Sequence, residues 1–260
     1  MDERVKTYCM TDNIHKFKDY VQNLRGSINF DIIPITIKWN SWEIFNYVLD
    51  EKIMRPFDFV GHLQLTIDWN RFRMFEKLLY MYGCKDIDLL KKLLPSILME
   101  DRLEFLVLIW EYFGYLEDHN SINLSDYFDF IISNDSYRCL EFLLGRVAFE
   151  ISTDTLSNIL LSNSVKCFDI LFPYFEQMYT SEQARDALVS FATQLNLRKK
   201  LNRNKMIEKL VSSFNIDLSD FNIEVIVSVL RLLDKKKLCD FVMSYKVEEK
   251  KVENEKIRQL

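Results

Sequence analysis

The 260-residue sequence contains few of the residues that make sharp turns, with only 5 glycines and 4 prolines. Proteins built from many short strands need such residues at their turns. Their scarcity therefore favours an all-α fold joined by short polar loops. It also argues against a glycine-rich phosphate-binding loop, because no G-x-G-x-x-G, G-K-[ST] or G-x-S-x-G sequence occurs.

Long hydrophobic runs are missing as well. The N-terminal sequence MDERVKTYCM is charged and has no apolar segment typical of a signal peptide. The most apolar window, residues 103–117, contains three glutamates and is too short to span a bilayer. The five cysteines are odd in number and lack C-x-x-C spacing, which predicts reduced thiols in the cytoplasm or the nucleus.

No arrangement of residues typical of catalysis or metal binding is present. The three histidines, His15, His62 and His119, lie in separate repeats and have no second histidine or cysteine three or four residues away, so no metal site is predicted. Cys139 and Cys167 occupy equivalent places in two similar segments, where a small hydrophobic core residue is favoured over a catalytic thiol. We therefore expect no enzyme activity and no cofactor.

What the sequence does contain is an internal repeat. TIKWNSWEIFNYVL (36–49) returns as TIDWNRFRMFEKLL (66–79), and three further segments keep the pattern. Each segment has an apolar stretch, a short polar turn and a second apolar stretch with F/L-x-x-L-L spacing. That spacing places Phe75, Leu78 and Leu79 on one helical face. The three further segments cover residues 96–109, 130–144 and 159–172.

One repeat of about thirty residues is too small to bury its own apolar face, so stacked neighbours must bury it. The sequence therefore predicts one solenoid domain over residues 1–245, built from six to eight stacked helix-turn-helix repeats, followed by a charged tail at 246–260. The repeats are expected near 10–30, 31–60, 61–90, 91–120, 121–150, 151–180, 181–215 and 216–245.

Two stretches resemble the ankyrin repeat family. EKLLYMYGCKDID (76–88) is similar to the end of an ankyrin repeat, with a closing glycine at Gly83, and SNDSYRCLEFLLGR is similar to a turn and second helix. The T-P-L-H opening is absent and the glycine of the inter-helix turn is replaced in every repeat, as in divergent arrays of protists and large DNA viruses. The resemblance implies a protein-binding scaffold that uses its concave side, and it suggests a pathogen factor acting on host proteins.

The tryptophans of the repeat allow two interpretations. Trp39 and Trp69 fall in the turn between two helices, and Trp42 lies just outside it. Repeated positions of this kind predict packing wedges between neighbouring hairpins. The alternative is an aromatic anchor on an exposed edge, since tryptophan is enriched at binding hot spots.

An acidic middle region is the first candidate binding site. Residues 111–154 contain nine acids against two arginines. Such a patch can steer a basic partner, although it can also be ordinary solvated surface. The acids expected near one edge of the array are Glu117, Asp118, Asp126 and Asp129, while Asp135 is expected at the far turn.

Two alternatives come from the C-terminal part of the chain. The basic stretch 196–205 could contact phosphates of a nucleic acid through Arg198, Lys199, Lys200 and Arg203. Residues 221–238 are similar to a degenerate F-box, which would make the protein a substrate-recruiting adaptor of a ubiquitin ligase. The main hypothesis is a monomeric, non-enzymatic scaffold for another protein, in the cytoplasm and with the nucleus as the alternative.

Overall fold

The computed structural model describes residues 3–24, 31–51, 58–83, 87–113, 124–180, 182–189, 209–210 and 212–214. Within these ranges all regular secondary structure is helical and no strand occurs. The all-α class predicted from the sequence is therefore confirmed for this part of the chain. None of its helices has the length and apolar character needed to cross a membrane.

The helices follow one another as pairs, each joined by a short turn. The first pair begins at Glu3, ahead of the start near residue 10 that the sequence suggested. An additional helix covers 182–189. The pairs are α1 (Glu3–Met10) with α2 (Ile14–Asn23), α3 (Ile33–Trp39) with α4 (Trp42–Asp50), α5 (Phe59–Asp68) with α6 (Phe72–Tyr82), α7 (Ile87–Met99) with α8 (Leu103–Phe113), α9 (Phe128–Ser133) with α10 (Tyr137–Leu144), and α11 (Thr153–Ser162) with α12 (Val165–Met178).

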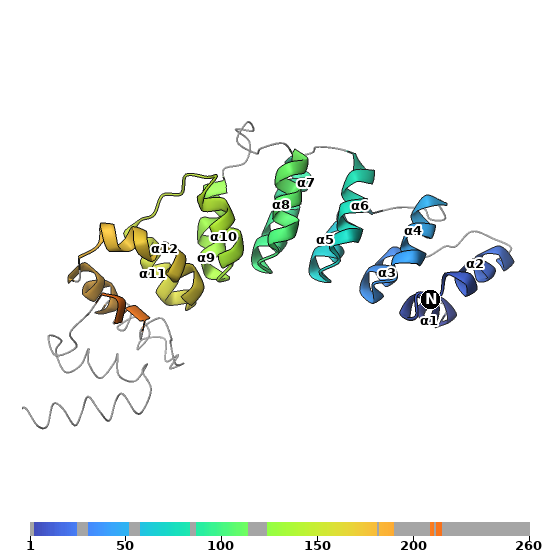
Figure 1. The fold of residues 1–260 in the computed structure, drawn as a ribbon, viewed down its shortest axis with the longest axis horizontal. Coiled ribbons are helices and arrows are strands. Elements are labelled where there is room, and N and C mark those ends of the chain that lie inside the picture. Colours follow the sequence, from blue (N-terminus) through green and yellow to red (C-terminus); the bar gives the residue numbers. More distant parts are fainter. Residues whose placement is uncertain are drawn as a thin grey trace, which may run out of the picture. The chain divides into compact units, whose positions relative to one another are not determined.

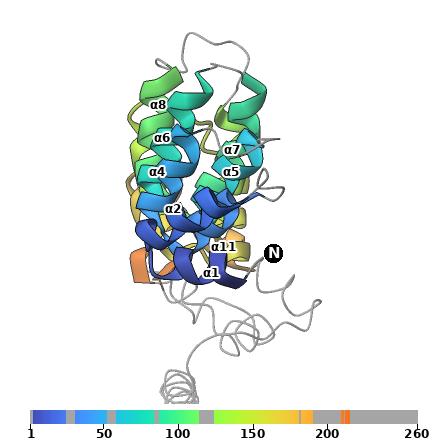
Figure 2. The same ribbon diagram turned by 90° about the vertical axis from the view of Figure 1, so that its right-hand side faces the viewer.

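The chain divides into two compact units. Unit 1 contains residues 1–131 and 138–147, and unit 2 contains residues 132–137 and 148–260. In unit 1 the pairs from α1 to α8 succeed one another (Figure 1). The first helices α1, α3, α5 and α7 each contact the next, while α2 contacts α4 and α6 contacts α8. The second helices thus form one layer, with α5 and α7 in the other (Figure 2).

Large apolar side chains from the second helices fill the core. Phe75, Leu78 and Leu79 are fully buried on one face of α6, as their spacing predicted. Phe105 of α8 is also fully buried, with its ring centre 5.0 Å from that of Phe75 and 5.4 Å from that of Phe72. Successive pairs in unit 1 are therefore joined by ring contacts as well as by aliphatic packing.

Each inter-helix turn contains one residue in the left-handed backbone region. Asparagine and aspartate adopt this conformation more readily than other non-glycine residues, because their short polar side chains bond locally. This explains how the turns form without the glycine of the ankyrin pattern. Gly83, with φ of 65°, closes α6 as predicted. The left-handed turn residues are Asp12, Asn40, Asn70, Asp101, Asp135 and Asn163.

Candidate functional site

The turns form a recurring set of hydrogen bonds between one helical pair and the next. In three turns the left-handed residue is an aspartate, and its carboxylate accepts backbone N–H groups in the first turn of the next pair's second helix. This carboxylate satisfies donors that a helix N-terminus leaves open. The bonds run from Glu43 and Ile44 to Asp12 (3.1 and 3.2 Å), from Arg138 and Cys139 to Asp101 (3.3 and 3.0 Å), and from Lys166 and Cys167 to Asp135 (3.1 and 2.9 Å).

The residue after the left-handed position makes a second link, in which the later pair supplies the side chain and the earlier pair supplies the backbone acceptor. Ser41 Oγ donates to the carbonyl of Cys9, and Ser164 Oγ donates to the carbonyl of Ile132. Together with the aspartate bonds, these contacts form what we call the turn frame. It joins side chains to backbone atoms at three junctions between successive pairs. The register of these pairs therefore does not depend on the side chains that they expose.

Arg71 replaces the serine in the turn between α5 and α6. Its Nε donates to the carbonyl of Ile37 at 3.0 Å, and its Nη2 donates to the carbonyl of Lys38 at 3.1 Å. These carbonyls lie at the end of α3, where helix geometry leaves acceptors open and the helix dipole favours a cation. The arginine thus ties α5 and α6 to the preceding pair.

The two repeated tryptophans lie on the surface at the same turns. Trp39 is 38% exposed and Trp69 is 42% exposed, so neither is a buried packing wedge, and the exposed-edge interpretation is favoured. The physical reason for their exposure is their position at the end of the first helix. They directly precede the left-handed turn residue, at the edge of the packed helices. Lys38 Nζ lies 5.7 Å from the ring centre of Trp39 and 5.6 Å from that of Trp69.

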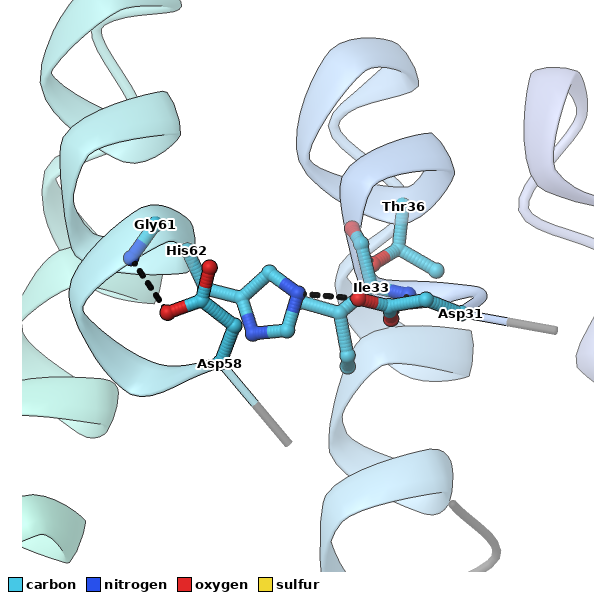
Figure 3. Close-up of polar contacts among 6 residues, drawn as sticks. All are labelled: Asp31, Ile33, Thr36, Asp58, Gly61 and His62. Atoms are coloured by element: carbon cyan, nitrogen blue, oxygen red, sulfur yellow. Dashed lines mark hydrogen bonds and ion pairs between the residues drawn. The ribbon is translucent and has the colours of Figure 1, made fainter. Parts of the chain in front are cut away.

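A polar contact lies at the opposite end of the first helices. The His62 ring, buried on α5, reaches Asp31 through its Nε2, and the same carboxylate accepts the N–H of Ile33 at 3.0 Å (Figure 3). Asp58 caps α5 by accepting the N–H of Gly61 at 2.9 Å. Because Asp31 and His62 belong to successive pairs, their contact ties the starts of α3 and α5 together.

The predicted acidic site is only partly within the described residues. Asp126 lies in a short 3-10 helix (η2, Leu124–Tyr127), and Asp129 lies at the start of α9; both are exposed. Asp135 lies in the turn after α9, as expected, where it belongs to the turn frame. Glu117, Asp118, Arg198, Lys199, Lys200 and Arg203 fall outside the described residues, as do the F-box-like segment 221–238 and the tail 246–260.

One of the two arginines of the acidic region is paired inside unit 1. Arg138 Nη2 contacts Glu104 Oε1 at 2.7 Å. The hydrogen bond from Arg138 is the main cause that lowers the pKa of Glu104 below its usual value. Both side chains are partly exposed, so the pair adds little to stability in water. Its effect is to remove one arginine from the charge that a partner would meet.

The cysteines of the second helices are core residues, as predicted. Cys139 and Cys167 are fully buried near the starts of α10 and α12. Burial raises the pKa of the Cys139 thiol, and the nearby Asp101 carboxylate raises it further. Cys9 in α1 is also buried, and burial together with Asp12 raises the pKa of its thiol to about 12. Such thiols are poor nucleophiles, because the reactive form is the thiolate.

We expect Cys9 and Cys139 to resist alkylation in the folded protein. With a pKa of about 12, the Cys9 thiol is almost fully protonated at neutral or mildly alkaline pH. Iodoacetamide at mildly alkaline pH, followed by peptide mass spectrometry, should leave both residues unmodified. The same treatment in guanidinium chloride should label both rapidly. Equal labelling rates in the folded and denatured protein would contradict the burial of these thiols.

The described residues contain no group of three or more histidine, cysteine or acidic side chains that could hold a metal ion.

Comparison with known proteins identifies no family for the chain: no family model, no curated protein and no solved structure matches it. The candidate surfaces are therefore the exposed turn edge with its tryptophans and the acidic residues around α9.

Sequence reasoning found the tryptophans but missed Lys38. A single lysine between two repeats carries no periodic signal, since its counterpart in the next repeat is Asp68. The turn frame was missed for a similar reason, because its bonds connect residues more than thirty positions apart. The available signal was an asparagine or aspartate after each first helix, followed by serine or arginine in most turns.

Proposed function

We propose that the protein is a non-enzymatic scaffold of ankyrin-like helical repeats that binds another protein. The observation that supports this most directly is the turn frame. The same backbone-directed bonds recur at three junctions between successive pairs, and a link that repeats in this way allows pairs to be added one after another, which is the logic of repeat proteins. In such proteins the exposed residues of each pair are available for recognition, because the frame does not depend on them.

The binding side that this proposal favours is the concave and loop side implied by the ankyrin resemblance. Asp126 precedes the first helix α9 and Asp129 begins it, and both are exposed. The proposal assigns them to this side. Opposite charge on a partner would speed encounter more than it would strengthen the final complex. A basic segment is therefore the partner chemistry that suits this side.

The test is a binding measurement with a partner captured by pull-down from the native cytosol and identified by mass spectrometry. Neutralising Glu117, Asp118, Asp126 and Asp129 with Gln or Asn should slow association by about ten-fold and reduce its dependence on salt. Association rates at low and high ionic strength provide the readout, and circular dichroism checks that the helical content is unchanged.

A matched control separates this edge from net charge alone. Neutralising four other exposed acids of the same region, Glu111, Glu141, Glu150 and Asp154, changes the total charge equally. We expect this control to slow association much less. If both sets act alike, the effect comes from overall charge and not from the proposed side. If neither set matters, the acidic region is solvated surface.

A further inference from the structure

Large apolar side chains are exposed at the ends of four consecutive first helices in unit 1. Met10 ends α1 and is 51% exposed, and Met99 ends α7 and is 48% exposed. Between them, Trp39 ends α3 and Trp69 directly follows the last residue of α5. Because α1, α3, α5 and α7 contact one another in this order, the four side chains form a row that we call the turn-edge strip.

The length of the strip suits a segment of polypeptide. Neighbouring helices in a layer lie about 8–10 Å apart, so three intervals span roughly 24–30 Å. An extended chain rises about 3.3 Å per residue, so about eight or nine residues would cover the strip. A patch of this length with two exposed tryptophans is unusual for a surface that only faces water.

Lys38 gives the strip a positive charge at its centre. Its ammonium lies over both tryptophan rings, and among the described residues it forms no ion pair. Aromatic faces attract a cation without neutralising it. A carboxylate that approaches this ammonium would therefore gain an ion pair beside two apolar surfaces, where partial exclusion of water strengthens the attraction.

Most acids of the same edge are already used within the structure. Asp12 and Asp101 accept backbone N–H groups of the turn frame. Glu100 forms an ion pair with Arg102, with 3.5 Å between Glu100 Oε2 and Arg102 Nη2. Glu43 and Asp68 remain exposed near the strip. With the exposed Arg73 on α6 they give this edge a mixed charge, whereas binding to an anionic lipid surface would need a broadly basic face. A single carboxylate directed at Lys38 can avoid them.

We propose that the turn-edge strip binds a segment of a partner protein in which apolar side chains stand next to an aspartate or glutamate. The apolar side chains contact Trp39 and Trp69, and the carboxylate pairs with Lys38. The inference rests on the proposed scaffold function but assigns a different surface and a different partner charge. The strip lies at the ends of first helices, whereas the acidic residue Asp129 lies at the start of one.

Selection from a random-sequence peptide library on the full-length protein tests this directly, with counter-selection on a variant carrying Trp39→Ala and Trp69→Ala. Retained peptides should be enriched in an acidic residue beside leucine, phenylalanine or tryptophan. Their affinity, measured by fluorescence anisotropy, should fall about ten-fold or more on either tryptophan substitution. Lys38→Gln should weaken binding about three-fold or more and flatten its salt dependence.

Two matched substitutions control for general effects on the surface. Tyr80→Ala removes an aromatic side chain that is 58% exposed on α6, and Lys18→Gln removes a lysine that lies over one ring, 4.9 Å from the centre of Tyr47. Neither should change the affinity of the selected peptides. Equal losses in these controls would overturn the inference.

Other outcomes decide between this inference and the scaffold proposal. If the selected peptides are basic and respond to Asp126 and Asp129 but not to Trp39 and Trp69, the strip inference fails and the scaffold proposal stands. If no selected peptide distinguishes the protein from its double-tryptophan variant, the inference fails. Vesicles of phosphatidylcholine and phosphatidylserine should not bind, and binding that depends on the tryptophans would replace the protein partner with a membrane.

Discussion

Replacing Phe105 by alanine is expected to lower the free energy of unfolding by about 3–5 kcal/mol. The side chain is fully buried, and its ring lies against Phe72 and Phe75 of the preceding pair. Alanine would remove these contacts and leave a cavity between α6 and α8, which rigid neighbouring helices can fill only in part. Urea denaturation followed by circular dichroism measures the change.

Tyr80→Ala is the matched control for this prediction. Tyr80 also belongs to a ring pair between α6 and α8, with its centre 5.6 Å from that of Tyr112, but it is mostly exposed. Removing it leaves no cavity, so we expect a loss of about 1 kcal/mol or less. Similar losses for Phe105→Ala and Tyr80→Ala would show that burial at Phe105 does not stabilise the fold as described.

The features that the sequence predicted correctly are those with a local period. Phe75, Leu78 and Leu79 are spaced to share one face of a helix, and their burial follows from that spacing alone. Gly83 closes α6 because only a residue that tolerates positive φ fits after the last turn. The first helix of the chain was harder to locate, because α1 buries only Val5 and Cys9 and shows little periodicity.

The candidate sites depend on contacts that a local pattern does not contain. Asp135 and Asn163 are alike in sequence terms, as polar residues after an apolar helix, yet Asp135 caps the second helix of the next pair. Trp39 was assigned to packing because it repeats, although repetition holds equally for an exposed edge. A repeated residue is buried only if its helix still lies against the neighbouring helices at that point. Where each helix ends relative to its neighbours is known only once the pairs have assembled.

The turn frame leads to the second large expected effect, at Asp135 in unit 2. Asp135→Ala should lower the free energy of unfolding by about 2–3 kcal/mol. Loss of the carboxylate that caps α12 costs about 1–2 kcal/mol. Alanine in the left-handed conformation, at φ of 53°, adds roughly 1 kcal/mol of strain. Asp135→Asn should cost less than alanine, because it keeps one acceptor oxygen and a side chain that tolerates this conformation.

Glycine substitutions separate the cap from the backbone strain. Asp135→Gly removes the cap without strain and should still destabilise by about 1 kcal/mol. Asn40→Gly is the control, because Asn40 has a φ of 57° and its side chain makes no bond to the following pair among the described residues. This substitution should be nearly neutral.

Hydrogen exchange gives a local readout of the cap, since the Asp135 carboxylate accepts hydrogen bonds from the amides of Lys166 and Cys167. These amides should exchange faster in Asp135→Gly, and unchanged exchange would contradict the cap.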